Sequence, residues 1–230
     1  IILVGETRDK ETAKIAVEAA LTGHLVFTTL HTNDSASSVM RLTEMGIEPY
    51  LVASSTIGII AQRLLRKVCN ECKEAYTPDK HILEFLKIPE SDNLTFYHAR
   101  GCEKCNNTGY KGRIGAYEVL KFDDKVRELV SGNSNAQELR NYAREAGMLT
   151  LLDYSIQLAL QGWTTIDEVM RVTFSDTGQS GLCPHCAKTI KDEFNTCPSC
   201  GYNLKKKCHK CSAPLKPDWI YCSNCGENVK

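Results

Sequence analysis

Two short apolar segments that end in polar residues decide the fold: Ile1-Ile-Leu-Val-Gly-Glu6 and Thr22-Gly-His24-Leu-Val-Phe-Thr-Thr-Leu-His31-Thr-Asn-Asp34. Both are typical of buried parallel strands. Between them, Glu11 to Leu21 has helical periodicity, and Gly23 stands where a helix C-cap belongs. We expect two further helices, one from Asn33 or Asp34 to Met45 and one over about Tyr50 to Leu64. Strand and helix alternate at short spacing, which predicts an α/β domain with a largely parallel sheet.

The polar residues that follow these two strands form a candidate site. An acid such as Glu6, carried by a strand to the carboxyl edge of a sheet, can meet Mg²⁺ or orient a water molecule. From the same edge, His31 could donate a hydrogen bond to a phosphate. A plainer interpretation makes Glu6 a surface acid and makes His24 and His31 hydrogen-bonded structural residues. Two polar clusters at the ends of neighbouring strands favour a site.

The rest of the chain divides into an insertion, a helical segment and a cysteine-rich tail. Residues 68–112 hold two C-x-x-C turns around a short helical stretch near His81 to Leu86, and Arg113 to Lys121 is predicted to be a strand. Helices follow, and two segments fit the capping box: Ser134-Asn-Ala-Gln137 and Thr165-Ile-Asp-Glu168. We expect a domain over residues 1–174 that contains the insertion, a linker over residues 175–181, and a small domain over residues 182–230.

All twelve cysteines fall in C-x-x-C pairs: Cys69/Cys72, Cys102/Cys105, Cys183/Cys186, Cys197/Cys200, Cys208/Cys211 and Cys222/Cys225. This spacing puts two thiolates on one tight turn, which suits a tetrahedral metal and favours a reducing compartment. The first two pairs predict one structural zinc site. The last four pairs repeat a single unit twice, which predicts two more zinc sites in a double zinc ribbon that needs metal to fold. We expect its small core to consist of Phe194, Trp219, Ile220 and Tyr221.

Charge and hydropathy argue against two function classes. The formal net charge is zero, which gives no support for nucleic-acid binding. Residues 180–230 carry eight Lys and four acidic residues, and two zinc sites with four thiolates each would cancel this excess. No apolar run reaches the roughly 18 residues that span a bilayer. We therefore expect a soluble, cytosolic protein without a nucleic-acid partner.

Five segments, in order, resemble one protein family. Leu3-Val-Gly-Glu-Thr-Arg-Asp9-Lys-Glu-Thr-Ala13 resembles the Walker B segment of type II secretion and type IV pilus assembly ATPases, and Thr22 to Asp34 resembles their histidine box. Ala61-Gln-Arg-Leu-Leu-Arg66 followed by Cys69-x-x-Cys72 resembles the start of their zinc-binding insertion, and Gly101 to Val119 resembles its end. Two later segments resemble the C-terminal helices of the family: Gly147-Met-Leu-Thr-Leu151 and Gly162 to Val172. The resemblance covers residues 1 to about 174, and the tail is an addition to the family pattern.

This resemblance implies a RecA-like ATPase domain that works as a homohexamer. By the resemblance, Glu6 polarises the attacking water, His31 approaches the γ-phosphate, and Arg8 and His24 are neighbours of the nucleotide site. The substrate would be ATP with Mg²⁺. Hydrolysis would drive a cytoplasmic motor that docks on an inner-membrane platform protein and adds pilin or pseudopilin subunits. The zinc-binding insertion favours an assembly motor over a retraction motor.

One part of the family pattern is missing from these residues, the phosphate loop G-x-x-x-x-G-K-[ST]. We therefore expect the C-terminal part of a longer ATPase, cut inside an element, that does not hydrolyse ATP alone. The alternative is a zinc-ribbon adaptor whose ATPase remnant is only a scaffold. The intact Glu6 and His31 favour the motor. Pilus assembly, competence and type II secretion all stay open, and we expect the ribbons to bind an unknown protein partner.

Overall fold

The computed structural model describes residues 1–78, 80–89 and 94–174, and in the tail residues 190, 194, 196–197, 201, 208, 210–211, 215 and 220–227. These residues belong to two compact units. The first consists of Ile1–Glu74 and Tyr97–Val172, and the second consists of Ala75–Phe96 and Thr173–Lys230. The linker predicted over residues 175–181 lies outside the described residues.

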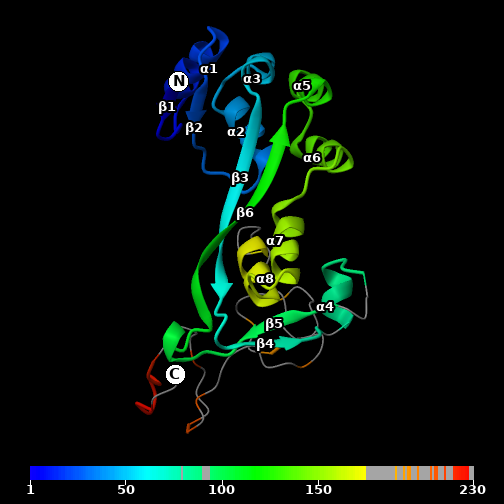
Figure 1. The fold of residues 1–230 in the computed structure, drawn as a ribbon. Coiled ribbons are helices and arrows are strands. Elements are labelled where there is room, and N and C mark those ends of the chain that lie inside the picture. Colours follow the sequence, from blue (N-terminus) through cyan, green and yellow to red (C-terminus); the bar gives the residue numbers. More distant parts are fainter. Residues whose placement is uncertain are drawn as a thin grey trace. The chain divides into compact units, whose positions relative to one another are not determined.

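The chain begins with the expected strand, helix and strand (Figure 1). The predicted burial of these strands is wrong, because Leu3 is 77% and Phe27 53% exposed. Their parallel sheet has two strands in the described residues, and the longest strand pair of the chain is antiparallel. Strand β1 (Ile2–Val4) pairs in parallel with β2 (Val26–Thr28), and helix α1 (Lys10–Leu21) connects them. The carboxylate of Asp9 caps the helix by accepting the backbone N–H of Thr12 at 2.8 Å. Since the two strands are parallel, both end at the same edge of the sheet, and the residues that follow them are brought together.

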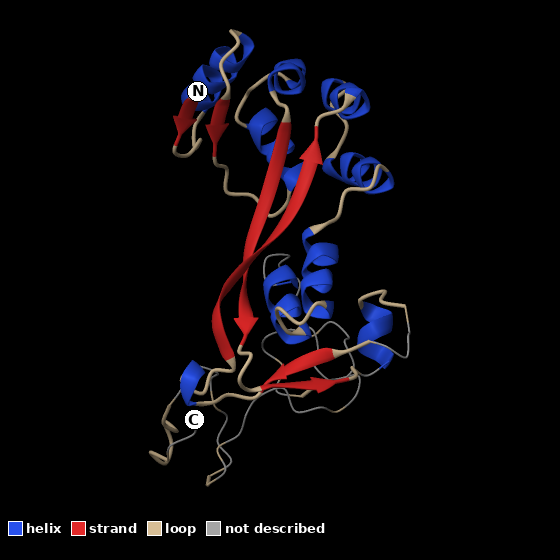
Figure 2. Ribbon diagram, viewed as in Figure 1, coloured by secondary structure: helices blue, strands red, loops and turns tan. Residues whose placement is uncertain are grey.

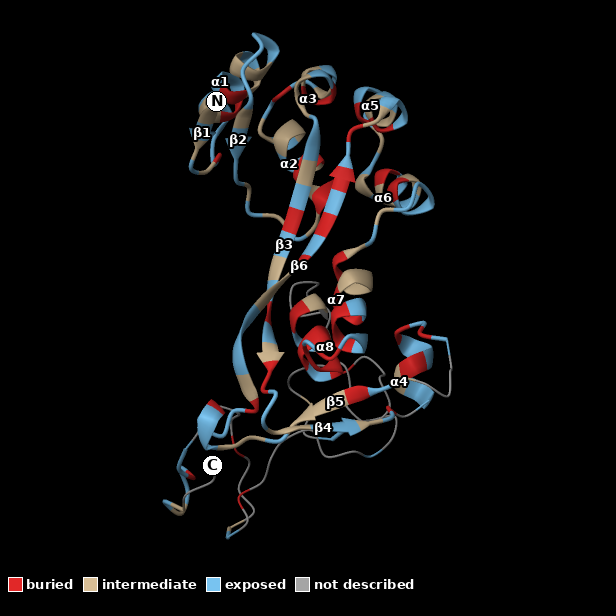
Figure 3. Cartoon of the chain, in the orientation of Figure 1, coloured by how far each residue is buried: buried red, intermediate tan, exposed pale blue. Residues whose placement is uncertain are grey.

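The next part of the chain corrects the sequence prediction. Helix α2 (Ser35–Glu44) forms as expected, but the helix predicted over Tyr50 to Leu64 is wrong. The chain is helical only over α3 (Pro49–Ser55) and then enters strand β3 (Gly58–Val68). Buried and exposed residues alternate along β3 in Figure 3, which is the period of a strand. A glycine and β-branched residues open this segment, and both disfavour a helix.

A long antiparallel ribbon occupies the middle of the first unit. Strand β6 (Tyr110–Lys121) pairs with β3 from Gly58 opposite Lys121 to Arg66 opposite Arg113, and an irregularity follows before Val68. Figure 2 shows these two strands as the longest arrows. The predicted strand Arg113 to Lys121 is confirmed and starts three residues earlier than expected.

Four helices follow the ribbon: α5 (Asp124–Ser131), α6 (Ala136–Glu145), α7 (Leu151–Leu160) and α8 (Ile166–Phe174). One apolar core joins α1, α2 and α3 to α5 and α6, and its most buried members include Ala13, Val39, Val52, Val126 and Leu139. A second core packs α7 and α8 on the ribbon through Ala61, Leu65, Ala116, Leu151, Leu158 and Val172. The ribbon is therefore covered along one face by helices.

The two predicted capping boxes are partly right. The box at α6 exists but uses Asn135 and Glu138, one residue later than predicted, because Asn135 Oδ1 accepts the N–H of Glu138 at 3.0 Å. At α8, Thr165 Oγ1 accepts the N–H of Glu168 at 3.1 Å, as predicted. The carboxylate of Glu168 does not return to the backbone N–H of Thr165 but binds Arg66 and Arg171. Only half of that capping box therefore forms.

Glu168 is a fully buried acid between two arginines. Its Oε2 accepts hydrogen bonds from Nε of Arg66 at 2.9 Å and from Nε of Arg171 at 2.7 Å. The backbone N–H of Arg66 donates to Oε1 at 2.9 Å, so the acid ties α8 to the end of β3. Burial opposes ionisation, but the bonds from Arg171 and Arg66 outweigh it and lower the pKa of Glu168 to about 2.

Replacing Glu168 with Ala is expected to lower the free energy of unfolding by about 1–3 kcal/mol, because it removes a buried carboxylate that accepts hydrogen bonds from two half-exposed arginines. Denaturant titration at neutral pH measures this loss. Glu128→Ala is the matched control: Glu128 also pairs with a cation, Lys125, but both side chains are exposed, so the cost is about 0–1 kcal/mol.

The stabilisation by Glu168 is also expected to depend on pH. The pKa of Glu168 in the folded protein lies below its ordinary 4.5, so its stabilisation is present above pH 4.5 and is lost as the pH falls from 4.5 toward 2. The stability difference between wild type and Glu168→Ala is expected to shrink across this window. A difference that stays constant from pH 6 to pH 2.5 would contradict the ion-pair explanation.

The second unit contains the predicted short helix and parts of the tail. Helix α4 (Lys80–Phe85) is confirmed. Strands β4 (Lys73–Tyr76) and β5 (Phe96–Ala99) flank this helix in the sequence and form a two-stranded sheet, whose residues are divided between the two units. The predicted tail core is wrong in part, because Ile220 and Tyr221 are exposed while Ile190 and Leu215 are buried; Trp219 lies outside the described residues. Within the described ranges, no helix combines the length and the hydrophobicity that crossing a bilayer requires.

Candidate functional site

Glu6 and His31 lie together beyond the carboxyl ends of β1 and β2. The Nε2 atom of His31 is 3.0 Å from Oε1 of Glu6, which is hydrogen-bond distance. Two bonds align the loops that carry them: Thr29 Oγ1 donates to the carbonyl of Gly5 at 2.7 Å, and the N–H of Thr7 donates to the carbonyl of Thr29 at 3.0 Å. The parallel pairing predicted from the sequence therefore produces the predicted meeting of the two side chains.

Arg8 completes this cluster. Its Nη2 atom is 2.5 Å from Oε2 of Glu6, so each oxygen of the carboxylate has a different partner. The hydrogen bond from Arg8 is the main reason that the pKa of Glu6 is lowered, and His31 contributes a smaller effect in the same direction. Glu6 is therefore an ionised carboxylate at neutral pH.

His24 occupies a different place. It precedes β2, whereas His31 follows it, so the two histidines lie at opposite ends of that strand. The Nδ1 atom of His24 is 3.1 Å from the carbonyl of Ala19 and 3.3 Å from Oγ1 of Thr22, at the C-terminal end of α1. The structure thus brings Glu6, Arg8 and His31 together and places His24 at a helix end.

The turn between His31 and α2 is held by Asp34, which the sequence predicted as a possible start of this helix, and by two arginines for which the sequence analysis predicted no such contact. Asp34 caps α2 by accepting the N–H of Ser37 at 2.7 Å, and its other oxygen accepts Nη2 of Arg140 at 2.8 Å. Arg63 on β3 donates to the backbone carbonyls of the two residues that follow His31, each at 3.4 Å.

Glu118 on β6 also reaches this turn. It is 3% exposed and accepts the backbone N–H of Ser35 at 2.9 Å and the Ser35 hydroxyl at a shorter distance. These contacts join residues far apart in sequence, so no local motif could have revealed them. The one available signal was an acid at a core-facing position of a predicted strand.

A surface cavity of about 310 Å³ lies beside this turn. Its lining comes from the turn and from α2: His31, Thr32, Asn33, Ser37, Met40, Arg41 and Glu44. The exposed imidazole of His31 borders both this open space and Glu6, so it can reach a ligand without a rearrangement of the strands.

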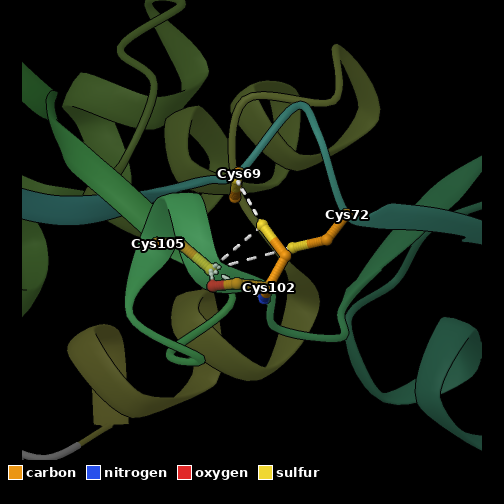
Figure 4. A group of neighbouring side chains, drawn as sticks. All are labelled: Cys69, Cys72, Cys102 and Cys105. Atoms are coloured by element: carbon orange, nitrogen blue, oxygen red, sulfur yellow. Dashed lines mark hydrogen bonds between the residues drawn. The ribbon is translucent and has the colours of Figure 1, made fainter.

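The first four cysteines form one cluster. Figure 4 shows the thiols of Cys69, Cys72, Cys102 and Cys105 converging from two turns, and all four sulfur atoms lie within 4.8 Å of one another. The Sγ–Sγ distances are 3.9 Å for Cys69–Cys102, 3.9 Å for Cys72–Cys105 and 3.8 Å for Cys102–Cys105. A tetrahedral zinc with bonds of about 2.3 Å places its sulfurs about 3.8 Å apart, so this cluster fits zinc.

The surroundings of the cluster favour thiolate ligands that are balanced by a cation. Backbone N–H groups of Cys102 and Gly109 each donate to Sγ of Cys105 at 3.2 Å and, against the effect of burial, lower its pKa to about 6. Burial raises the pKa of Cys72 to about 12. Four thiols cannot all ionise side by side unless a divalent ion offsets their charge. The donor Gly109 must be a glycine, because its φ is +77° and a Cβ there would lie 2.6 Å from the carbonyl oxygen of Ala99.

A second cluster lies in the tail and consists of Cys208, Cys211, Cys222 and Cys225. Its sulfur separations are 3.5 Å for Cys208–Cys225 and 3.6 Å for Cys211–Cys222, which are close to the tetrahedral value and far above the 2.05 Å of a disulfide. The third predicted set cannot be compared in this way, because Cys183, Cys186 and Cys200 lie outside the described residues, although Cys197 is described and buried.

Comparison with known proteins gives two family matches. Residues 1–171 match the family described as type II/IV secretion system protein, and residues 183–226 match the double zinc ribbon family. The chain is 48% identical over 175 residues to the type IV pilus assembly ATPase PilB of Thermus thermophilus, which covers 75% of this chain and 20% of that protein. It is 46% identical over 173 residues to the type II secretion system protein E of Pseudomonas aeruginosa, which covers 75% of this chain and 34% of that protein.

Solved structures give the same fold. The pilus retraction motor PilT with bound ADP matches with a TM-score of 0.50 and 26% identity over 74% of this chain and 38% of that one. The Legionella pneumophila ATPase DotB, at 22% identity and a TM-score of 0.50, supports the fold alone. These neighbours confirm the predicted RecA-like α/β fold, and the double-ribbon match confirms the predicted zinc-binding tail.

The chain spans between a fifth and about a third of the length of the curated relatives that it matches. Within that span, the family match takes in the Glu6–His31 cluster and the first cysteine cluster. The chain belongs to the type II/IV secretion system protein family, whose matched relatives are pilus assembly and secretion ATPases, and it carries a double zinc ribbon.

Proposed function

We propose that this chain is the C-terminal part of a motor ATPase that hydrolyses ATP with Mg²⁺ to power assembly of a type IV pilus or a type II secretion pseudopilus. The observation that carries the proposal is the convergence of Glu6, Arg8 and His31 beyond two parallel strands. An acid and a histidine at this edge of an α/β sheet stand where ligands bind in such folds. Relatives named as pilus assembly and secretion ATPases support the same conclusion.

The geometry suggests how Glu6 and His31 share the reaction. Both oxygens of Glu6 are engaged, one by Arg8 and one by His31. When the γ-phosphate of ATP is bound, His31 would donate to a phosphate oxygen instead, and this move would free one oxygen of Glu6 to accept a hydrogen bond from the attacking water. Arg8 would remain on the other oxygen and keep Glu6 ionised. His24 lies at the other end of β2, and we propose that it acts away from the nucleotide, by fixing the end of α1 before β2.

Nucleotide affinity must come from a phosphate-binding loop, and the 230 residues contain no G-x-x-x-x-G-K-[ST] motif. We therefore predict that the 230-residue chain alone releases no phosphate from ATP above background, while the product of the complete reading frame turns ATP over. Phosphate release by the two purified proteins, at equal concentration with Mg²⁺, measures this difference.

Two results would change the proposal. Turnover by the 230-residue chain would show that phosphate binding does not need residues outside it. Absence of turnover by the complete product would favour the adaptor, in which the ATPase remnant is a scaffold for the zinc ribbons.

The proposed assembly follows from the family. The motor would be a homohexamer in the cytoplasm, held at the inner membrane by a platform protein of the pilus or secretion machine. Residues 1–174 would form the ATPase part with its insertion at 68–112, residues 175–181 a linker, and residues 182–230 the ribbons. We propose that Cys183, Cys186, Cys197 and Cys200, which lie within the residues that match the double zinc ribbon family, hold a further zinc ion. We assign the ribbons a protein partner rather than a nucleic acid.

A further inference from the structure

Glu118 is a buried carboxylate that joins two helices. One of its oxygens, Oε1, accepts both the backbone N–H and the hydroxyl of Ser35. The other, Oε2, accepts the backbone N–H of Leu151 at 3.3 Å. Ser35 is the first residue of α2 and Leu151 is the first residue of α7.

The pattern of these bonds gives Glu118 a definite role in the fold. The first N–H groups of a helix have no partner within the helix, and the N-terminus carries a partial positive charge that attracts an acid. Each oxygen of Glu118 serves one helix in this way. Among the described residues, no lysine or arginine forms an ion pair with Glu118, so its bonds to the two helix ends are what compensate its burial.

One of these two helices is the one that follows His31. Only three residues separate His31 from Ser35, and the start of that segment is tied to the sheet through Thr29 and Gly5. The other helix, α7, packs on the β3–β6 ribbon through Leu151 and Leu158. Glu118 therefore fixes the far end of the His31 turn to the frame formed by β6 and α7.

We propose that Glu118 is a positioning residue for ATP hydrolysis: by holding Ser35 and Leu151 at once, it sets the His31 turn relative to α7. This inference rests on the proposed function, since it assigns Glu118 a role through His31. It also makes a direct link between the nucleotide site and the C-terminal helices, because a displacement of the turn must either move α7 or break one of these bonds.

A double-mutant cycle in the complete reading-frame product tests the role. In Glu118→Gln the amide keeps one acceptor oxygen for Ser35 but turns its N–H₂ group toward the N–H of Leu151, so one of the two links is lost at nearly constant size. We expect kcat to fall about tenfold and KM for ATP to change less than threefold, because a small misplacement of a catalytic group lowers the rate more than binding. In a His31→Ala background, the same change is expected to have no further effect on kcat.

The outcomes separate the inference from the function on which it rests. If Glu118→Gln lowers kcat by the same factor with and without His31, Glu118 does not act through His31 and the inference fails. If Glu118→Gln leaves kcat unchanged while His31→Ala lowers it, the inference fails and the proposed function stands. If His31→Ala leaves kcat unchanged, the assigned role of His31 fails, and the inference fails with it.

A second experiment tests the link itself without using activity. Leu151→Pro removes the N–H that Glu118 accepts, at the first helical position, where proline is well tolerated. Leu151→Ala is the matched control, because it also shortens the side chain but keeps the N–H. Amide hydrogen exchange over residues 30–40 is expected to be at least several-fold faster in Leu151→Pro than in Leu151→Ala. Equal exchange in the two variants would overturn the link, whatever the ATPase activity.

Discussion

Replacing Glu6 with Gln in the complete protein is expected to lower kcat for ATP hydrolysis by about 10²–10⁴-fold, the usual loss when a general base or water-orienting acid is removed. Gln has nearly the same size and can keep a hydrogen bond to Arg8 or His31, so the fold should persist. It cannot carry the negative charge that polarises water. Steady-state phosphate release, with the folded state checked by thermal unfolding, measures the loss.

Glu11→Gln is the matched control for this variant. Glu11 is an acid only five residues away, in the first turn of α1; its side chain is exposed, and the ion-pair partners of Glu6 are Arg8 and His31 instead. Its replacement removes the same charge from the same region without touching the cluster. We expect this control to keep nearly full turnover. If Glu6→Gln also kept more than half of the wild-type rate, the assignment of Glu6 as the carboxylate that polarises the attacking water would be wrong.

Removing one thiol from a cysteine cluster is expected to remove one zinc ion from the protein. In Cys102→Ser the first cluster keeps three sulfurs, and the hydroxyl is a far weaker ligand than a thiolate. Structural zinc contributes about 10–16 kcal/mol of binding free energy in small zinc domains, so a damaged site loses both metal and local structure. Elemental analysis of the purified protein gives the zinc content, and hydrogen exchange over residues 69–109 gives the local loss.

The tail supplies the control for this experiment. Cys208→Ser makes the same chemical change in the second cluster, and it is expected to remove a different zinc ion and to raise exchange over residues 208–227 instead. The double variant should lose two ions. An unchanged zinc content in either single variant would mean that its cluster does not hold structural zinc.

The sequence was sufficient for the features that depend on local pattern. Parallel strands around α1 follow from apolar runs separated by a helix of the right length, and their carboxyl ends necessarily bring Glu6 near His31. The cysteine clusters follow from spacing alone, since a C-x-x-C turn places two sulfurs on one side. In these cases, a short motif decides the local geometry, and the regular pairing of two strands or two C-x-x-C turns brings the motifs together.

Features that depend on distant partners were not accessible. The residues from Gly58 onward form a strand rather than a helix because β6, more than forty residues later, offers an antiparallel partner. Glu168 fits a capping box in sequence, but two arginines bind its carboxylate more strongly than a backbone N–H does. The bonds of Glu118 and Arg140 to the His31 turn were missed for the same reason, because each crosses more than eighty residues.

The register irregularity between Arg66 and Val68 has a consequence for how this family can vary. Arg63 and Glu118, which contact the His31 turn, lie on one side of this irregularity along the ribbon. The first cysteine cluster lies on the other side. A hairpin can be lengthened, shortened or decorated at its tip while the ladder below keeps its pairing. Residues 69–109 can therefore change in length without any change in the strand pairing that places Arg63 and Glu118 beside the His31 turn.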